Sequence, residues 1–361
     1  MIRFLAILLI TFGSYISHAF AQQKILKEAV ERAKGDGFSG VILVAENGKV
    51  LYKEVMGMRI YEKRILLHED DIFELASLSK QFTAMMIMMC KEKGLLDFDD
   101  QVSKYVEIPY PKITIRNLLT HTSGLPDYQA IMDAHWDKSK VDGNTEILEY
   151  LREYAPVKSF DPGEQYEYSN TGYVLLASIV EKATGKDFVE LMREWIFQPL
   201  KMKSTDIRSL EEKAKVQTFA AGHLKDENGN FVNANTFHSS DYTVWLGERK
   251  GPGRVSSNAA DLLKWDQALN TEKLVSKETM EEAFTPFRLN NERRSYYGFG
   301  WEIEPKSPFG KMVMHTGDNP GYKTIIVRFI EEDKTIIILN NNAHPDMMRL
   351  VEAATLSLGK W

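Results

Sequence analysis

The sequence predicts an α+β fold in which an antiparallel sheet is built from both ends of the chain and flanked by helices. β-branched runs lie near the two ends, over residues 40–45, 50–55, 311–315, 324–330 and 335–340. The long stretch between them lacks such runs and shows apolar helical patterns instead. We therefore expect a mainly helical region inserted between the strands, with a ligand cleft where it meets the sheet.

A secretory signal peptide is predicted for residues 1–21. Arg3 precedes an apolar stretch over residues 4–12, and the small-x-small pattern Ala-Phe-Ala ends at Ala21. This stretch falls well short of the ~20 residues that a membrane-spanning helix needs. We expect cleavage after Ala21, an exported protein that is periplasmic or secreted, and no stable membrane span after cleavage. The alternative is that the segment is kept as an anchor.

The remaining residues, 22–361, are predicted to form one domain. Its sheet part is expected over about 22–75 and 296–361, and its helical part over about 76–295. The formal net charge is −6, and no dense run of Lys or Arg is present, so nucleic acid is not an expected partner. The one cysteine, Cys90, ends an apolar helical run and is interpreted as a buried core residue.

The individual elements follow from local patterns. Helical patterns cover 24–32, 81–93, 115–121, 173–184 and 346–358. The first two strands are joined at Asn47-Gly48, which is a strong hairpin signal, and the last two by a charged turn over 331–334. Gly94 and Gly185 end two of the helices.

Ser77 and Lys80 lie three residues apart at the predicted start of the helix over 81–93. On a helix this spacing puts both side chains on one face, one turn apart. A lysine can take the serine proton when burial or nearby positive charge lowers its pKa, and free backbone N–H groups at a helix start can stabilise an oxyanion. The alternative is a helix-capping serine followed by a surface lysine, because S-x-x-K occurs about once by chance in a chain of this length.

Two later stretches carry matching chemistry. Tyr168 lies two residues before Asn170 in a loop that precedes a helix. A phenol can relay protons and an amide can hold a substrate carbonyl, although Asn170 could instead cap the helix. His315, Thr316 and Gly317 follow one another at the end of a strand, where a glycine lets a substrate lie close to the backbone. A single histidine at this position could instead have a purely structural role.

Taken together, Ser77-Leu78-Ser79-Lys80, Tyr168-Ser169-Asn170 and His315-Thr316-Gly317 resemble the three motifs of the serine penicillin-binding protein and β-lactamase superfamily. The tyrosine of the second motif makes the chain similar to the branch with class C β-lactamases, D-alanyl-D-alanine carboxypeptidases, D-aminopeptidases and related esterases. The resemblance covers about residues 38–340 and implies a β-lactamase/transpeptidase-like fold.

This resemblance implies a role for each motif residue. Ser77 is implied to be the acylated nucleophile, with Lys80 and Tyr168 sharing its proton transfers. Asn170 is implied to hold the substrate amide. No cofactor and no metal are implied, and the remaining histidines lack the spacing of a metal site. His121, in a THTSGLP stretch, is interpreted as part of a structural turn.

The third motif is implied to line the opposite wall of the cleft through His315, Thr316 and Gly317. The N–H group of Asp318 is implied to complete an oxyanion hole with that of Ser77. Class C β-lactamases carry a lysine where this chain has His315, and an imidazole is mostly neutral at pH 7. Recognition of a β-lactam carboxylate is therefore expected to be weaker.

The sequence thus predicts an exported serine hydrolase that forms an acyl-enzyme on Ser77. The expected partners are D-amino-acid peptides, cleaved as by a DD-carboxypeptidase, or small esters and amides. A class C-like β-lactamase is the enzymatic alternative. A penicillin-binding sensor or a binding protein without turnover is the alternative from another class. The sequence leaves the substrate and the oligomeric state open.

Overall fold

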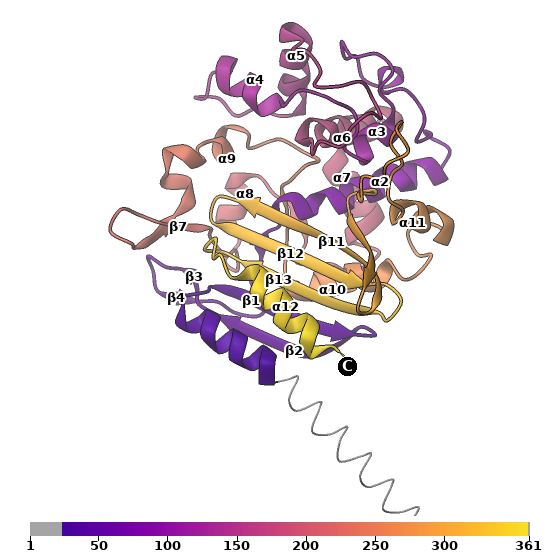
Figure 1. The fold of residues 1–361 in the computed structure, drawn as a ribbon. Helices are drawn as coiled ribbons and strands as arrows, with labels where there is room; N and C mark the ends of the chain where they lie inside the picture. The colour runs from indigo at the N-terminus through magenta and orange to yellow at the C-terminus, as the bar shows by residue number, and fades with distance from the viewer. Residues whose placement is uncertain (1–23, 360–361) are drawn as a thin grey trace, which may run out of the picture.

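The computed structural model describes residues 24–359, and a six-stranded antiparallel sheet lies at its centre (Figure 1). The strand order is β10-β11-β12-β13-β1-β2. The strands are β1 (Gly40–Glu46), β2 (Lys49–Met56), β10 (Glu302–Ser307), β11 (Gly310–Asn319), β12 (Tyr322–Phe329) and β13 (Lys334–Asn340). Because β1 pairs with β13 from Gly40↔Asn340 to Glu46↔Lys334, the two ends of the chain form one sheet, which confirms the predicted fold class.

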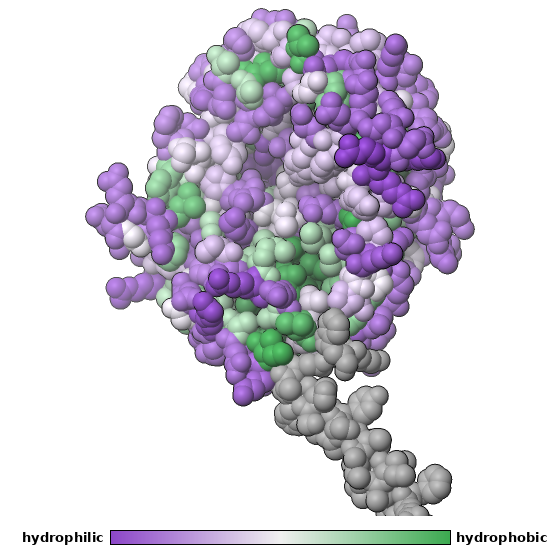
Figure 2. All heavy atoms as spheres, in the orientation of Figure 1, coloured by the Kyte–Doolittle hydropathy of each residue, from purple (hydrophilic) through white to green (hydrophobic). Residues whose placement is uncertain are grey.

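One face of the sheet is covered by the helix over 24–35 and by α12 (Met347–Ser357). Ile42 and Val44 point toward this outer layer and pack in one cluster with residues of both helices. Val41 and Leu43 alternate with them and point into the other, larger core. Figure 2 shows that this side of the molecule is mostly hydrophilic, with apolar residues gathered over β11 and β12 beside α12.

The other face of the sheet meets the helical region predicted for the middle of the chain (Figure 1). Its helices are α2 (Ser79–Glu92), α3 (Ile115–Leu119), α4 (Tyr128–His135), α5 (Asn144–Tyr154), α6 (Asn170–Thr184), α7 (Phe188–Met192), α8 (Leu210–Lys215), α9 (Tyr242–Trp245), α10 (Ala259–Ala268) and α11 (Lys277–Ala283). Every residue of α2 from Ser79 to Cys90 is buried, so this helix runs through the core. Cys90 is buried as predicted, and burial raises the pKa of its thiol to about 12.

Residues 58–257 also contain short strands that the sequence patterns did not indicate. They are β3 (Met58–Ile60), β4 (Ile65–Leu66), β5 (Phe73–Glu74), β6 (Asp206–Ile207), β7 (His223–Lys225), β8 (Phe231–Asn233) and β9 (Val255–Ser257). Strands of two or three residues are too short to show an alternating pattern. The pairing of β5 with β9 matters for the site, because it fixes the segment that leads to Ser77.

Two sequence predictions have no structural test here. The predicted signal peptide, residues 1–21, lies outside the described residues. The organisation of residues 22–361 as one domain stays a prediction. Between residues 24 and 359, no helix has the length and apolar character required to cross a membrane.

Candidate active site

Ser77 lies in a single 3-10 turn, Ala76–Leu78, immediately before α2. Ala76 has a φ of +50°, in the left-handed region that costs a residue with a side chain about 1–2 kcal/mol. The neighbouring residue Leu75 holds this conformation through both its backbone groups. Its N–H donates to the carbonyl of Val255 at 2.9 Å, and its carbonyl accepts from the Thr324 hydroxyl at 2.8 Å.

The side chain of Lys80 is completely buried and meets Ser77, as the spacing predicted. Its Nζ lies 3.1 Å from Ser77 Oγ, 2.8 Å from Asn170 Oδ1 and 3.0 Å from the Pro252 carbonyl. Burial lowers the pKa of Lys80 well below its usual value, and the positive charge of Arg249 lowers it further. The oxygens of Asn170 and Pro252 can only accept hydrogen bonds, so a neutral amine gives its two hydrogens to them and turns its lone pair to Ser77.

The Tyr168 side chain lies over the same amine. Lys80 Nζ is 4.6 Å from the centre of the phenol ring, and the Tyr168 hydroxyl is hydrogen-bonded to Ser77. The surrounding protein atoms raise the pKa of this phenol, and the hydrogen bond to Ser77 lowers it by less. Tyr168 is therefore protonated at neutral pH and can act as a proton donor beside Ser77.

Asn170 is the first residue of α6, but it does not cap this helix. Ser169 is the N-cap, and its Oγ accepts from the Gly172 N–H at 3.2 Å. The capping alternative for Asn170 is therefore wrong. Its side chain is directed to Lys80 and joins the second motif to the first.

The third motif lies on β11 and packs directly against the turn that carries Ser77. A Cβ atom on Gly317 would lie 2.2 Å from the Leu75 carbonyl oxygen and 3.2 Å from the Ala76 Cβ. Only a glycine lets β11 approach the Ser77 turn this closely. Asp318, one residue further, pairs with Lys323 of β12 at 3.0 Å.

His315 is buried and uncharged, with both ring nitrogens occupied inside the protein. Nδ1 lies 2.6 Å from the Thr316 carbonyl and Nε2 lies 2.9 Å from the Tyr297 hydroxyl. A carbonyl only accepts, so Nδ1 carries the hydrogen and Nε2 accepts from the hydroxyl of Tyr297. Burial and then the charge of Lys80 lower the pKa of His315 to about 3. This side chain orders the third motif and offers no cation to a ligand.

His121, which the sequence suggested to be part of a structural turn, contacts the segment that carries Tyr168 twice. Its carbonyl accepts from the Glu167 N–H at 2.9 Å, and its Nδ1 accepts from the Ser169 N–H at 3.0 Å. Its ring centre lies 4.3 Å from that of Tyr168. The residue itself has a φ of +56°. His121 therefore fixes Tyr168 from both sides.

Arg249 and Tyr297 are further site residues that sequence reasoning missed. Arg249 is buried and donates a hydrogen bond to the Tyr128 hydroxyl. Its positive charge lowers the pKa of Lys80. Both residues lie more than a hundred positions from Ser77 in the sequence, and neither belongs to one of the three motifs. Among residues 24–359, no three His, Cys, Asp or Glu side chains are grouped so that they could hold a metal ion.

This fold, with a serine hydroxyl, a buried amine and a phenol in contact, defines a serine hydrolase. The family model described as Beta-lactamase matches residues 23–359, and the chain belongs to this family. One sequence relative is the Penicillin-binding protein 4* of Bacillus subtilis (strain 168), which is 40% identical over 84% of this chain and 68% of its own length. Another is a D-aminopeptidase of Gluconobacter oxydans (strain 621H), which is 23% identical over 91% of this chain and 60% of its own length. The structure of an octameric penicillin-binding protein homologue from Pyrococcus abyssi superposes with a TM-score of 0.80, at 29% identity over 94% of this chain and 77% of that one. The resemblance inferred from the motifs is confirmed.

Proposed function

We propose that the protein is an exported serine hydrolase that cleaves D-amino-acid peptides, or small esters and amides, through an acyl-enzyme on Ser77. The observation that carries this proposal is the position of the Lys80 amine, 3.1 Å from Ser77 Oγ with both its other contacts acceptors. Names among the relatives support the substrate class, since one is a D-aminopeptidase. Export rests on the signal pattern in residues 1–21 and on bacterial penicillin-binding relatives.

The proposed acylation step uses the neutral amine of Lys80 as the base and the protonated phenol of Tyr168 as the acid. The neutral amine of Lys80 takes the proton of Ser77 as Oγ attacks the substrate carbonyl carbon. The N–H groups of Ser77 and Asp318 hold the oxygen that becomes negative, and Asn170 and Thr316 hold the substrate chain. Tyr168 gives its proton to the leaving amine or alcohol, and the C–N or C–O bond breaks.

Hydrolysis of the ester reverses these transfers. A water molecule gives a proton to the phenolate of Tyr168 and attacks the acyl carbon. Ser77 Oγ leaves and recovers its proton from the ammonium group of Lys80. The neutral amine and the protonated phenol are both restored, so no cofactor is consumed.

Rates on three substrates test this proposal. We expect Ser77-dependent kcat/KM values on a D-alanyl-D-alanine peptide or a p-nitrophenyl ester that exceed the value on a chromogenic cephalosporin, with Ser77→Ala as the inactive control. Efficient turnover of the cephalosporin alone would make the chain a β-lactamase and overturn the expected order of the three kcat/KM values. A stable penicillin adduct on Ser77 without turnover of any substrate, detected by mass spectrometry, would instead favour a sensor.

A further inference from the structure

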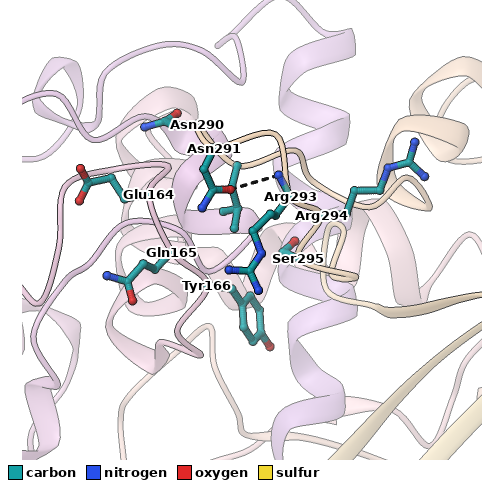
Figure 3. Close-up of a pocket in the computed structure, with 9 residues that line it drawn as sticks. Glu164, Gln165, Tyr166, Asn290, Asn291, Arg293, Arg294 and Ser295 are labelled. Atoms are coloured by element: carbon teal, nitrogen blue, oxygen red, sulfur yellow. Dashed lines mark hydrogen bonds between the residues drawn. The ribbon is translucent and has the colours of Figure 1, made fainter.

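Lys80 does not line the cavity of about 750 Å³ that is drawn in Figure 3. Its amine is buried elsewhere, between two acceptors that come from different segments of the chain. Asn170 Oδ1 belongs to α6, and the Pro252 carbonyl belongs to the segment over 246–254 between α9 and β9, which we call the base loop. The position of the base loop relative to α6 therefore determines how the amine is held.

The base loop is fixed to α2 on both sides of Pro252. The Gly251 carbonyl accepts from the Thr83 hydroxyl at 2.8 Å. The N–H of Val255, just beyond the loop, donates to Ser79 Oγ at 3.0 Å. These contacts direct the Pro252 carbonyl at the amine that lies between them on α2.

The side chain of Asn144, the first residue of α5, ties the base loop to α6. It is 9% exposed, and its Oδ1 accepts from the Lys250 N–H at 2.8 Å. Its Nδ2 lies 3.2 Å from the carbonyl oxygens of Lys250 and Val174 and 3.3 Å from the Ser178 hydroxyl oxygen. One amide thus joins the two segments that carry the acceptors of Lys80.

The bonds of Asn144 lie beside a close backbone contact. Gly251 has a φ of +108°, and a Cβ there would lie 2.1 Å from the Tyr173 carbonyl oxygen. The base loop and α6 therefore touch at this point. Lys250 and Val174 are the chain neighbours of these two residues, so the Asn144 amide bonds both sides of the contact.

The base loop also brings a charge to Lys80. Burial lowers the pKa of the amine most, and the charge of Arg249 on this loop lowers it further. The carboxyl of Asp142, two residues before Asn144, acts on Arg249 in turn, and burial raises the pKa of this carboxyl to about 7. A base loop that lifts from the amine admits water and moves the guanidinium, and both changes return the pKa of Lys80 toward its usual value.

Four further titratable side chains face Lys80, namely His121, His315, Tyr168 and Tyr173. Burial lowers the pKa of each histidine and raises the pKa of each phenol. All four are therefore uncharged near neutral pH, and their charges stay constant where the amine loses its proton.

We propose that Asn144 is a positioning residue for the base, because its side chain holds the base loop against α6 and so keeps both acceptors of the Lys80 amine in place. The inference rests on the proposed function, in which Lys80 takes the proton of Ser77. Without the Asn144 amide, the ammonium form of Lys80 should persist to higher pH, and this form cannot accept a proton.

The titration of Lys80 tests the inference directly. It is followed by NMR of protein labelled at the lysine Cε, with Lys80→Met to identify the signal, in wild type, Asn144→Ala and Asn342→Ala. Asn342 is the matched control, since its buried side-chain amide also makes four hydrogen bonds, to Gly37, Ser39, Tyr61 and Asn340. We expect Lys80 to titrate at higher pH in Asn144→Ala and at the wild-type pH in Asn342→Ala.

Hydrolysis of a p-nitrophenyl ester gives a second measurement. The acid limb of kcat/KM should move to higher pH in Asn144→Ala, with a loss of about tenfold on that limb, the scale of one lost hydrogen bond, and rates near wild type above it. A purely structural role would lower the rate at every pH without moving the limb. Because Asp142 also titrates near neutral pH, the NMR titration decides which group has moved.

The outcomes separate the inference from the proposed function. An unchanged titration of Lys80 in Asn144→Ala, an equal shift in Asn342→Ala, or a wild-type Lys80 with its usual pKa overturns the role of Asn144. If Asn144→Ala does not fold, Asn144→Ser keeps a hydrogen-bonding hydroxyl at this position and is judged by the same criterion. The NMR titration needs no turnover, whereas the proposed function fails if wild type does not hydrolyse the ester or if Ser77→Ala still does.

Discussion

Replacing His121 tests whether catalysis depends on how Tyr168 is held. The perturbation is His121→Leu, which keeps an apolar side chain among the tyrosine rings but removes the acceptor of the Ser169 N–H. The matched variant is His121→Asn. Its Oδ1 is bonded to Cγ, as Nδ1 of histidine is, and asparagine tolerates the observed φ of +56°.

The expected magnitudes follow from these contacts. In His121→Leu the partly buried Ser169 N–H loses its acceptor, which costs about 1 kcal/mol of the free energy of unfolding. A shift of the Tyr168 segment by about 1 Å is expected to slow acylation by about a hundredfold. His121→Asn restores the acceptor and should recover most of the acylation rate, although it loses the ring contact with Tyr168.

The assay is the single-turnover rate of acylation by a p-nitrophenyl ester, measured beside urea unfolding of each variant. Substrate affinity should change little, because His121 has no place in substrate binding. The reasoning is refuted if His121→Leu remains folded and acylates at the wild-type rate. It is also refuted if His121→Asn is as slow as His121→Leu, because a restored acceptor would then not hold Tyr168 in place.

Three further predictions concern the same site. Lys80→Met removes the amine but keeps an unbranched side chain in a buried position, so we expect a loss of about 100- to 10,000-fold in kcat/KM on the ester. Thermal melting should show a modest loss of stability, because Asn170 Oδ1 and the Pro252 carbonyl lose their donor, and activity near wild type would contradict the prediction. Gly317→Ala places a Cβ 2.2 Å from the Leu75 carbonyl oxygen, so we expect about 1–3 kcal/mol of destabilisation with loss of activity, and wild-type unfolding would show that β11 can move away. The pKa of His315 is about 3 in the folded chain and about 6.5 when unfolded, so between these values the unfolded chain binds the extra proton. The free energy of unfolding should therefore fall on acidification from pH 6.5, by up to about 1.4 kcal/mol per pH unit from this group, and urea unfolding of His315→Gln should show a correspondingly smaller slope.

The sequence predicted those parts of the structure that depend on local spacing. Ser77 and Lys80 meet because three positions make one helical turn, and the sheet forms because β1, β12 and β13 carry uninterrupted apolar runs. β10 was missed because half of the residues in its sequence, EIEPKS, are charged and the strand is partly exposed at a sheet edge. The sequence left a capping role for Asn170 open as an alternative, because asparagine and serine are both good caps and only the tertiary contact of Asn170 with Lys80 shows that Ser169 is the cap.

Contacts between distant segments could not be predicted. Arg249 affects Lys80 from a loop that follows α9, and nothing in its local pattern distinguishes it from Lys250 or Arg254 as the cation that matters. His121 was set aside because its turn looks structural. It is structural, and the element that it holds carries Tyr168.

The chemistry of the site depends on which buried groups can give up their charge. Lys80 and Arg249 are both buried cations that act on each other, and a guanidinium does not deprotonate in a protein, so the amine is the group that becomes neutral. The contacts of Lys80 suit this state, because Asn170 and Pro252 take its two hydrogens and leave the lone pair for Ser77. The protein atoms around Tyr168 raise the pKa of its phenol, which therefore keeps its proton at neutral pH. In the proposed mechanism, the same desolvation favours a neutral amine at Lys80 as the base and a protonated phenol at Tyr168 as the acid, both next to the Ser77 hydroxyl.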